Sequence, residues 1–334
     1  TRLLNPARAR AWLPDRECIW RRHGVWEVAA DGRPRLLRPD YFARVGGRAV
    51  DFNRDYLRPF ACRFAAAIRE VDPGAMIFLE TAPGLDLPEW RAEDPAGIVA
   101  APHWYDVPVL MLKDYHPWLG ADERARRPVI GPWIRRSYAR QLRDLRQEAF
   151  MRLRGAPTLI GECGIPFDLR GGRAFRTGDF SLAAKAMDRT LRAMDDALVS
   201  YTIWNYTADN TNARGDRWND EDLSIFSRDQ QTDPADIHSG GRALAAVIRP
   251  YAMATAGEPL RMTFDRRRRR FDFTFRHDPA VAGPTEFFIP HYQYPTGYRV
   301  EISDGRCEVD PGAQILRYYH TPGRDKHRVR VRPK

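Results

Sequence analysis

The feature that most constrains the fold of this sequence is a change of hydrophobic period near residue 256. Between residues 53 and 250, short apolar runs alternate with amphipathic segments whose apolar residues recur every three or four positions. Beyond residue 256 they recur every second position, as in Phe271-Asp-Phe-Thr-Phe275. The first pattern predicts parallel strands wrapped by helices, and the second predicts a small antiparallel sandwich.

Four short strands are predicted in the first part, and each ends near a polar or aromatic residue. The strands cover 76–80, 98–101, 158–162 and 200–204, with helices expected over 53–71, around 138–149, over 181–198 and over 242–248. Four parallel strands are half of a (β/α)8 barrel, so the expected fold class is α/β: the second half of a TIM barrel followed by a β-sandwich. We place the C-terminal part of the barrel in 1–255 and the β-sandwich in 256–334. A hairpin is predicted between Cys18 and Leu37 in the irregular segment before residue 53.

The strongly basic net charge by itself excludes few classes of function. The formal net charge is +10, but only four of the 54 basic residues are lysine, a skew more typical of genome composition than of a selected binding surface. The one dense run, 266–270, lies at a predicted β-turn. We therefore expect no nucleic-acid partner, whereas an attraction to anionic lipid surfaces is compatible with the charge.

Neither targeting signals nor metal-binding motifs can be identified. There is no apolar run of 18 residues and no signal peptide after Thr1, so the compartment stays unassigned. The cysteines Cys18, Cys62, Cys163 and Cys307 lack the spacing of a metal site, and we expect Cys62 and Cys163 to be buried thiols. No cofactor and no metal ligand is assigned.

Glu162 is the strongest candidate for a reactive group. It ends a predicted strand within Gly161-Glu162-Cys163-Gly164, and a carboxylate between two glycines is held rigidly with open space before it. A glutamate paired with an arginine at the mouth of a barrel is the structural alternative. Cleavage of a glycosidic bond with retention needs one carboxylate as nucleophile and a second carboxyl group about 5 Å away as acid.

Three motifs together resemble glycoside hydrolase family 5. They are Gly161-Glu-Cys-Gly164, Pro102-His-Trp-Tyr105 and Trp204-Asn-Tyr-Thr207. The longer run from Trp204 to Phe226 and the segment after Gly240 are similar to the branch of endoglycoceramidases, glucosylceramidases and steryl-glucosidases. This resemblance implies that Glu162 is the nucleophile of a retaining enzyme.

The resemblance also implies a substrate site around Glu162. His103 and Tyr105 would hydrogen-bond to the nucleophile, and Trp204 would form the floor under a sugar ring, since an indole stacks on the apolar face of a pyranose. A satisfied structural histidine is the alternative for His103. The residues expected to contact substrate are His103, Tyr105, Trp204, Asn205, Asp209, Asn210, Trp218 and Glu80. For the acidic loop from Asp209 to Asp222, which holds three of them, a solvated or cation-binding loop is the alternative. For Glu80 the alternative is a salt bridge at the barrel rim.

The acid/base partner of Glu162 is not found. Family members carry it in an Asn-Glu-Pro motif at the end of the fourth barrel strand, and this sequence has no such motif. Gly257-Glu258-Pro259 matches two letters but follows the last predicted helix, and Glu17 and Glu27 lie in the irregular segment. We expect the first four strands and the acid/base upstream of Thr1, so that this chain alone is inactive and assembles or precipitates.

The function expected from these features is that of a retaining β-glycosidase. Its substrate would be a carbohydrate or glycolipid, such as glucosylceramide or a steryl glucoside, and no nucleic acid is involved. Two alternatives stay open: an endo-β-glucanase acting on soluble polysaccharide, and a carbohydrate-binding protein without turnover.

Overall fold

A computed structural model describes residues 10–334 except 14, 83, 219 and 220. The chain divides between Phe64 and Ala65 into two compact units, which are described separately. The first unit contains the helix α1 (Ile19–Arg22) and the strand pairs β1 (Trp26–Val28) with β2 (Pro34–Leu36) and β3 (Arg44–Val45) with β4 (Arg48–Ala49). The predicted hairpin is thus confirmed with shorter strands, in which Trp26 pairs with Leu36.

The predicted helix after residue 53 is confirmed, but its apolar stripe is not buried. A π-helical segment (Asn53–Leu57) leads into α2 (Arg58–Val71). Phe60 is 56% exposed and Phe64 is 47% exposed, whereas the small side chains Ala61 and Ala65 are buried. Cys62 on the same helix is only half-buried, so its expected burial is wrong. A helix normally turns such a stripe towards a core, and here the described residues do not cover it.

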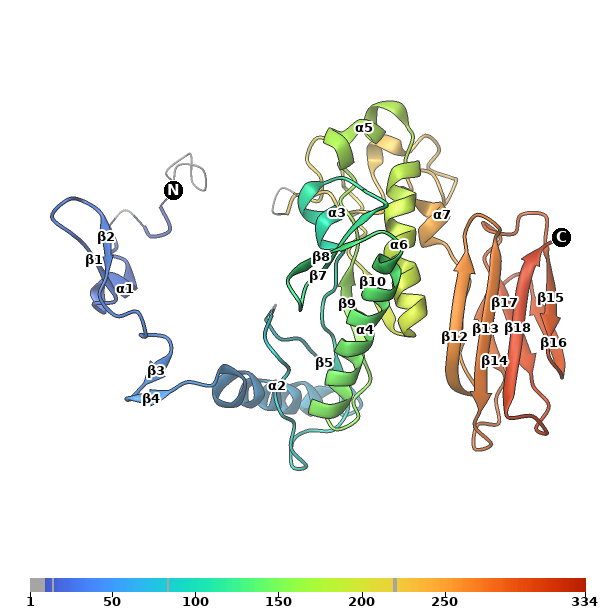
Figure 1. Cartoon of the computed structure of the whole chain (residues 1–334), viewed down its shortest axis with the longest axis horizontal. Helices are drawn as coiled ribbons and strands as arrows, with labels where there is room; N and C mark the ends of the chain where they lie inside the picture. The colour runs from blue at the N-terminus through green and yellow to red at the C-terminus, as the bar shows by residue number, and fades with distance from the viewer. Residues whose placement is uncertain (1–9, 14, 83, 219–220) are drawn as a thin grey trace. The chain divides into compact units, whose positions relative to one another are not determined.

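The second unit begins with four parallel strands that neighbour one another in chain order, drawn from teal to yellow-green in Figure 1. The strands β5 (Ile77–Leu79) and β6 (Ile98–Ala100) pair in parallel, as do β9 (Leu159–Cys163) and β10 (Ser200–Ile203). Two isolated parallel bridges, Ala100 to Thr158 and His103 to Glu162, join β6 to β9. All four predicted strands are therefore present and run in the same direction.

Two amphipathic helices complete this region. The helices α4 (Trp133–Arg152) and α6 (Ser181–Ala197) connect β6 to β9 and β9 to β10, and both were predicted. Their apolar faces meet the strands in one core that includes Leu142, Ile160 and Met187. The helix α7 (Leu244–Val247) is shorter than expected. Unpredicted are α3 (Val107–Leu112), the pair β7 (Leu119–Asp122) and β8 (Arg127–Ile130), α5 (Leu169–Thr177) and the 3-10 turn η2 (Arg228–Gln230).

The C-terminal part of this unit has two antiparallel four-stranded sheets. One has the order β11-β14-β17-β16 and the other β12-β13-β18-β15. The strands are β11 (Tyr251–Ala254), β12 (Gly257–Asp265), β13 (Arg270–His277), β14 (Thr285–Phe288), β15 (Tyr298–Ile302), β16 (Arg306–Asp310), β17 (Ile315–Tyr319) and β18 (Lys326–Pro333). Phe271, Phe273 and Phe275 point into the core between the sheets, as their period of two predicts.

The boundary expected between residues 255 and 256 stays a prediction. The first strand of the two-sheet region begins at Tyr251, and the arginine run after Asp265 forms the turn between β12 and β13. Among the described residues, no helix combines the length and the apolarity that crossing a bilayer requires.

Candidate active site

Glu162 lies near the end of β9, between two glycines that let neighbouring chain segments come close. A Cβ atom on Gly161 would stand 2.9 Å from the carbonyl oxygen of Ala101, and one on Gly164 would stand 2.1 Å from that of Trp204. Since the contacting atoms belong to backbone, these positions have little room for any other residue. The Glu162 side chain stays 23% exposed. It is therefore held firmly yet open to a ligand.

Two side chains from the segment after β6 bind the Glu162 carboxylate. The Tyr105 hydroxyl donates to Oε2 over 2.7 Å, and His103 Nδ1 lies 3.2 Å from the same oxygen. The backbone fixes this geometry, because the Trp104 amide donates to the Glu162 carbonyl. Burial and the hydrogen bond to Glu162 raise the pKa of Tyr105, so the phenol keeps its proton and acts as a donor. No described residue donates to the other oxygen, Oε1, which is free to react.

Glu80 completes a row of three side chains across neighbouring strands. Its Oε2 lies 3.1 Å from His103 Nε2, so the imidazole stands between two carboxyl groups. Burial raises the pKa of Glu80 and the charge of Glu162 adds to the effect, although His103 opposes it. A neutral imidazole donates only one hydrogen bond, whereas a protonated Glu80 or an imidazolium satisfies both contacts. The row can thus hold one proton beside the Glu162 carboxylate.

Trp204 and Cys163 occupy the adjoining strand ends. The Trp204 amide donates to the Cys163 carbonyl over 2.9 Å, directly after β10, and the Trp204 side chain is half-buried. The Cys163 thiol is buried as predicted and donates to the Thr202 carbonyl. Burial raises the pKa of Cys163 to about 12, which keeps it a thiol and makes it a poor nucleophile. The Glu162 carboxylate therefore stays the candidate reactive group of this motif.

The loop after β10 uses several of the predicted substrate contacts for its own structure. Asn210 is fully buried and donates to Asp216 and to Asp222, and Asn205 donates to Asp216 over 3.2 Å. Asp209 forms an exposed ion pair with Arg217. That Asn205, Asp209 and Asn210 contact substrate stays a prediction. The hydrogen bonds of Asn210 to Asp216 and Asp222 hold the loop together.

The same loop places one carboxylate that the sequence analysis did not single out. The charge of Glu221 makes a small contribution to the raised pKa of Tyr105, after burial and the hydrogen bond to Glu162. The Glu221 carbonyl accepts a hydrogen bond from the Asp216 amide. Its oxygen would lie 2.1 Å from a Cβ atom placed on Gly215. Trp218 is 62% exposed. Gly215 was the only local feature of the sequence that could have drawn attention to Glu221. The close contact between the two residues is recognisable only in the folded loop.

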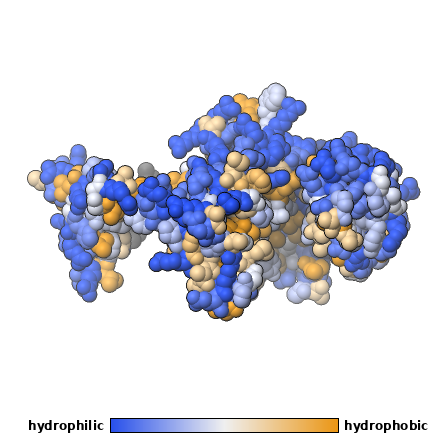
Figure 2. All heavy atoms as spheres, turned by 90° about the horizontal axis from the view of Figure 1, so that it is seen from below, coloured by the Kyte–Doolittle hydropathy of each residue, from blue (hydrophilic) through white to orange (hydrophobic). Residues whose placement is uncertain are grey.

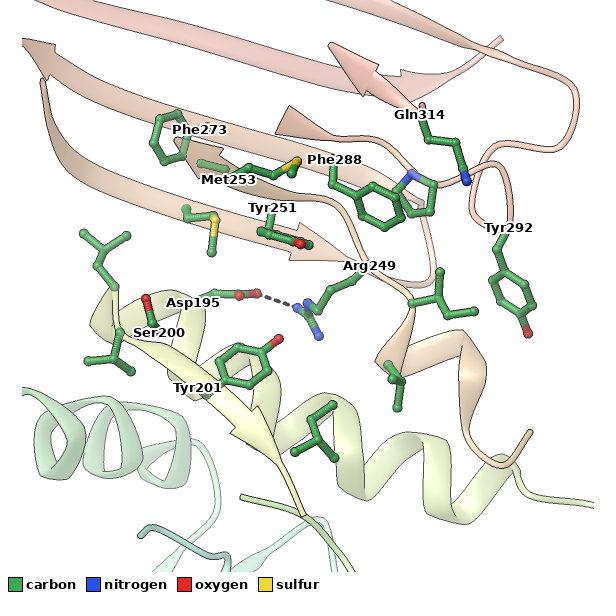
Figure 3. A pocket seen from close by; sticks show the side chains of 18 of the residues that line it. Asp195, Ser200, Tyr201, Arg249, Tyr251, Met253, Phe273, Phe288, Tyr292 and Gln314 are labelled. Carbon is green, nitrogen blue, oxygen red and sulfur yellow. Dashed lines mark hydrogen bonds and ion pairs between the residues drawn. The ribbon is translucent and has the colours of Figure 1, made fainter. Parts of the chain in front are cut away.

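A separate cavity of 940 Å³ lies between α6, β10 and the first strands of the sandwich. Figure 3 shows that its walls are mainly aromatic and aliphatic and that Asp195 and Arg249 form an ion pair there. Burial raises the pKa of Asp195 to about 6, although Arg249 opposes the shift. None of Glu80, His103, Tyr105 or Glu162 lines this cavity. The reactive carboxylate therefore lies outside it.

Comparison with known proteins agrees with these features. Residues 249–331 match the glycoside hydrolase family 5 C-terminal domain. A glucosylceramidase of Rhizopus delemar is 28% identical, over 96% of this chain and 50% of that protein. A glucosylceramidase of Cryptococcus neoformans var. grubii is 33% identical, over 86% of this chain and 42% of that protein. The resemblance to family 5 is thus confirmed, and this chain spans about half the length of these relatives.

Solved structures give the same relationship. The crystal structure of Cryptococcus neoformans sterylglucosidase 1 superposes with a TM-score of 0.84 at 31% identity, covering 95% of this chain and 50% of that one. Endo-glycoceramidase II from a Rhodococcus species matches with a TM-score of 0.60 at 18% identity, over 87% of this chain and 57% of that one, a likeness of fold alone.

Proposed function

We propose that this chain, which ends in a glycoside hydrolase family 5 C-terminal domain, carries the nucleophile of a retaining β-glycosidase that acts on a glycolipid. The observation that carries the proposal is the Glu162 carboxylate, open to ligand and bound by the Tyr105 hydroxyl. The glucosylceramidase and sterylglucosidase relatives support a glucose headgroup linked to a lipid as substrate. The net charge of +10 would favour binding at an anionic membrane surface.

The mechanism follows from the free oxygen of Glu162. Oε1 attacks the anomeric carbon while Tyr105 and His103 hold Oε2, and the bond to the leaving oxygen breaks as that oxygen takes a proton from a second carboxyl group. The same group then removes a proton from water, which attacks the glycosyl ester and releases Glu162. Two displacements on opposite faces retain the anomeric configuration.

The second carboxyl group is expected on a barrel strand that precedes the four described here. We propose that β5, β6, β9 and β10 form the second half of a (β/α)8 barrel. The exposed side chains of Phe60 and Phe64 on α2 and of Phe78 on β5, which is 52% exposed, support this view, because a complete barrel would cover such faces. The half described here would supply the nucleophile, and the other half would supply the acid.

A substrate panel tests the proposed function in the protein that contains this chain. We expect it to hydrolyse glucosylceramide or a steryl glucoside with a higher kcat/KM than a soluble cellooligosaccharide, and NMR to show the β-anomer of glucose first. Preference for the cellooligosaccharide would instead identify an endo-β-glucanase. Binding of these ligands without turnover would identify a carbohydrate-binding protein.

Replacing Tyr105 by phenylalanine tests the hydrogen bond to the nucleophile. The phenol stabilises the ionised Glu162 as it leaves the glycosyl ester, and a hydrogen bond to a charged group is worth about 1.5–3 kcal/mol. We expect Tyr105→Phe to lower kcat by about 10- to 100-fold with an unchanged melting temperature. Tyr206→Phe is a matched control, because Tyr206 is 64% exposed. Equal kcat for both variants would contradict the role given to Tyr105.

A further inference from the structure

Three histidines converge at one end of the sandwich, in a part of the chain unrelated to Glu162. His277 is the last residue of β13, His327 lies on β18, and His320 directly follows β17. One ring nitrogen from each lies within 4.8 Å of the other two. Because β13 and β18 belong to one sheet and β17 to the other, the cluster joins the two sheets.

The hydrogen bond between Asp304 and His327 indicates which ring nitrogen of His327 carries a proton. His327 Nδ1 lies 2.9 Å from Asp304 Oδ2, and the ring is completely buried. The Ser303 hydroxyl and the Thr321 amide also donate hydrogen bonds to Asp304, over 2.6 Å and 2.7 Å. An ionised carboxylate accepts, so Nδ1 carries the proton and Nε2 offers a lone pair. That lone pair faces His277 Nδ1 at 3.1 Å.

His320 has a buried ring nitrogen with no hydrogen-bond partner among the described residues. Its Nδ1 is inaccessible to solvent and receives no hydrogen bond from the described residues. The ring stacks on His277, with centroids 4.8 Å apart, and lies edge-on to Phe275. Buried polar atoms in folded proteins normally have a hydrogen-bond partner, so this nitrogen is available to bind a ligand.

We propose that His277, His320 and His327 bind one divalent transition metal ion, with zinc as the best match and Asp304 as the carboxylate that orients His327. Tetrahedral zinc with bonds of about 2.0–2.1 Å places its ligand atoms about 3.3 Å apart. Nδ1 of His277 and Nε2 of His327 already stand 3.1 Å apart, and a ring nitrogen of His320 lies within 4.8 Å of both rings' ligand atoms. A buried carboxylate behind a ligating histidine is the usual support of such sites.

The chemistry of the ligands decides which ions fit. Three neutral imidazoles suit zinc, copper or nickel, whereas magnesium and calcium prefer oxygen. With three ligands from two sheets the ion would link the strand ends, and its fourth position would take a water molecule. This link would stabilise the sandwich against unfolding whether or not the proposed glycosidase activity is correct, because no residue of the Glu162 site takes part.

Metal binding is tested on the purified protein without a histidine tag. After treatment with chelator and dialysis, titration with ZnCl₂ should show one equivalent bound at this site, and MgCl₂ should show none. Zinc should raise the melting temperature, and Co²⁺ should give the visible absorption of a tetrahedral complex. Absence of stoichiometric zinc binding, or of any change in melting, would overturn the proposal.

Substitutions assign the ion to the cluster. His320→Ala should weaken zinc binding by more than 100-fold, and Asp304→Asn by about 10- to 100-fold, as expected for a residue behind a ligand. His116→Ala is the control, because His116 is exposed and lies outside the cluster. Equal melting of His320→Ala and the original protein in chelator would show that the variant folds. Equal zinc affinity in His320→Ala and His116→Ala would place the ion elsewhere and overturn the proposal.

Discussion

Glu162→Gln is expected to abolish glycoside hydrolysis while leaving the fold intact. The amide keeps the shape of the side chain and can still accept from Tyr105, but it lacks the negative charge that attacks the anomeric carbon. Loss of a covalent nucleophile typically lowers kcat by roughly 10⁴-fold or more. Turnover of a glucoside with a good leaving group, compared before and after the substitution, measures the effect directly.

A small external nucleophile distinguishes this role from a structural one. Glu162→Ala opens space on the face from which the carboxylate would attack, so azide should restore turnover and give the α-glucosyl azide, the product of a single displacement. Glu258→Gln is the control, since Glu258 lies exposed on β12 and pairs with Arg276. Full activity of Glu162→Gln, or formation of the β-azide, would remove Glu162 from the role of nucleophile.

Local patterns in the sequence were sufficient to locate the strand that carries Glu162. The run from Thr158 to Glu162 predicted β9, and the flanking glycines predicted a rigidly held carboxylate. The close approach of the Ala101 and Trp204 carbonyls to these glycines is seen only in the structure. The contacts of Tyr105 and His103 with Glu162 agree with the resemblance to family 5. Such features are predictable because each depends on a few consecutive residues and on the direction of one strand.

Features that depend on distant segments were missed. The apolar stripe of α2 predicts a buried face, but burial also needs a partner, and the described residues do not cover Phe60 and Phe64. The histidine cluster joins His277 to His320 and His327 through strand pairing, so no spacing rule reveals it. Asn210 could be predicted as a polar loop residue, but only the folded loop shows that Asp216 and Asp222 occupy its amide.

Removing the positive charge of Arg242 is expected to destabilise the protein strongly. Arg242 is fully buried and donates to Asp222 over 2.6 Å, to Asn212 and to Gln230, with Phe175 packed against its guanidinium. In Arg242→Met the Asp222 carboxylate would remain buried without a cation. Breaking a buried pair in this way costs about 3–5 kcal/mol of unfolding free energy, which denaturant unfolding at pH 7 would detect.

The pH dependence of this loss identifies its cause. Burial raises the pKa of Asp222 even with Arg242 opposing it, and removal of Arg242 would raise this pKa further. A carboxyl group of raised pKa supports the fold at low pH and loses that contribution as the pH rises through its folded pKa. The deficit of Arg242→Met should therefore be largest at pH 7 and shrink as the pH falls towards about 4, near the pKa of an unfolded aspartate.

Two further variants separate the buried charge from lost packing. Arg217→Met breaks an exposed ion pair with Asp209 in the same loop and should change stability by at most about 1 kcal/mol. Adding Asp222→Leu to Arg242→Met removes the unpaired carboxylate and should recover part of the loss. If the double variant were less stable than the single one, the cost would lie in the hydrogen bonds of Arg242 and in the Asn210 amide left without Asp222. Either result shows what Arg242 contributes to the stability of the loop that carries Asp222 and Asn212.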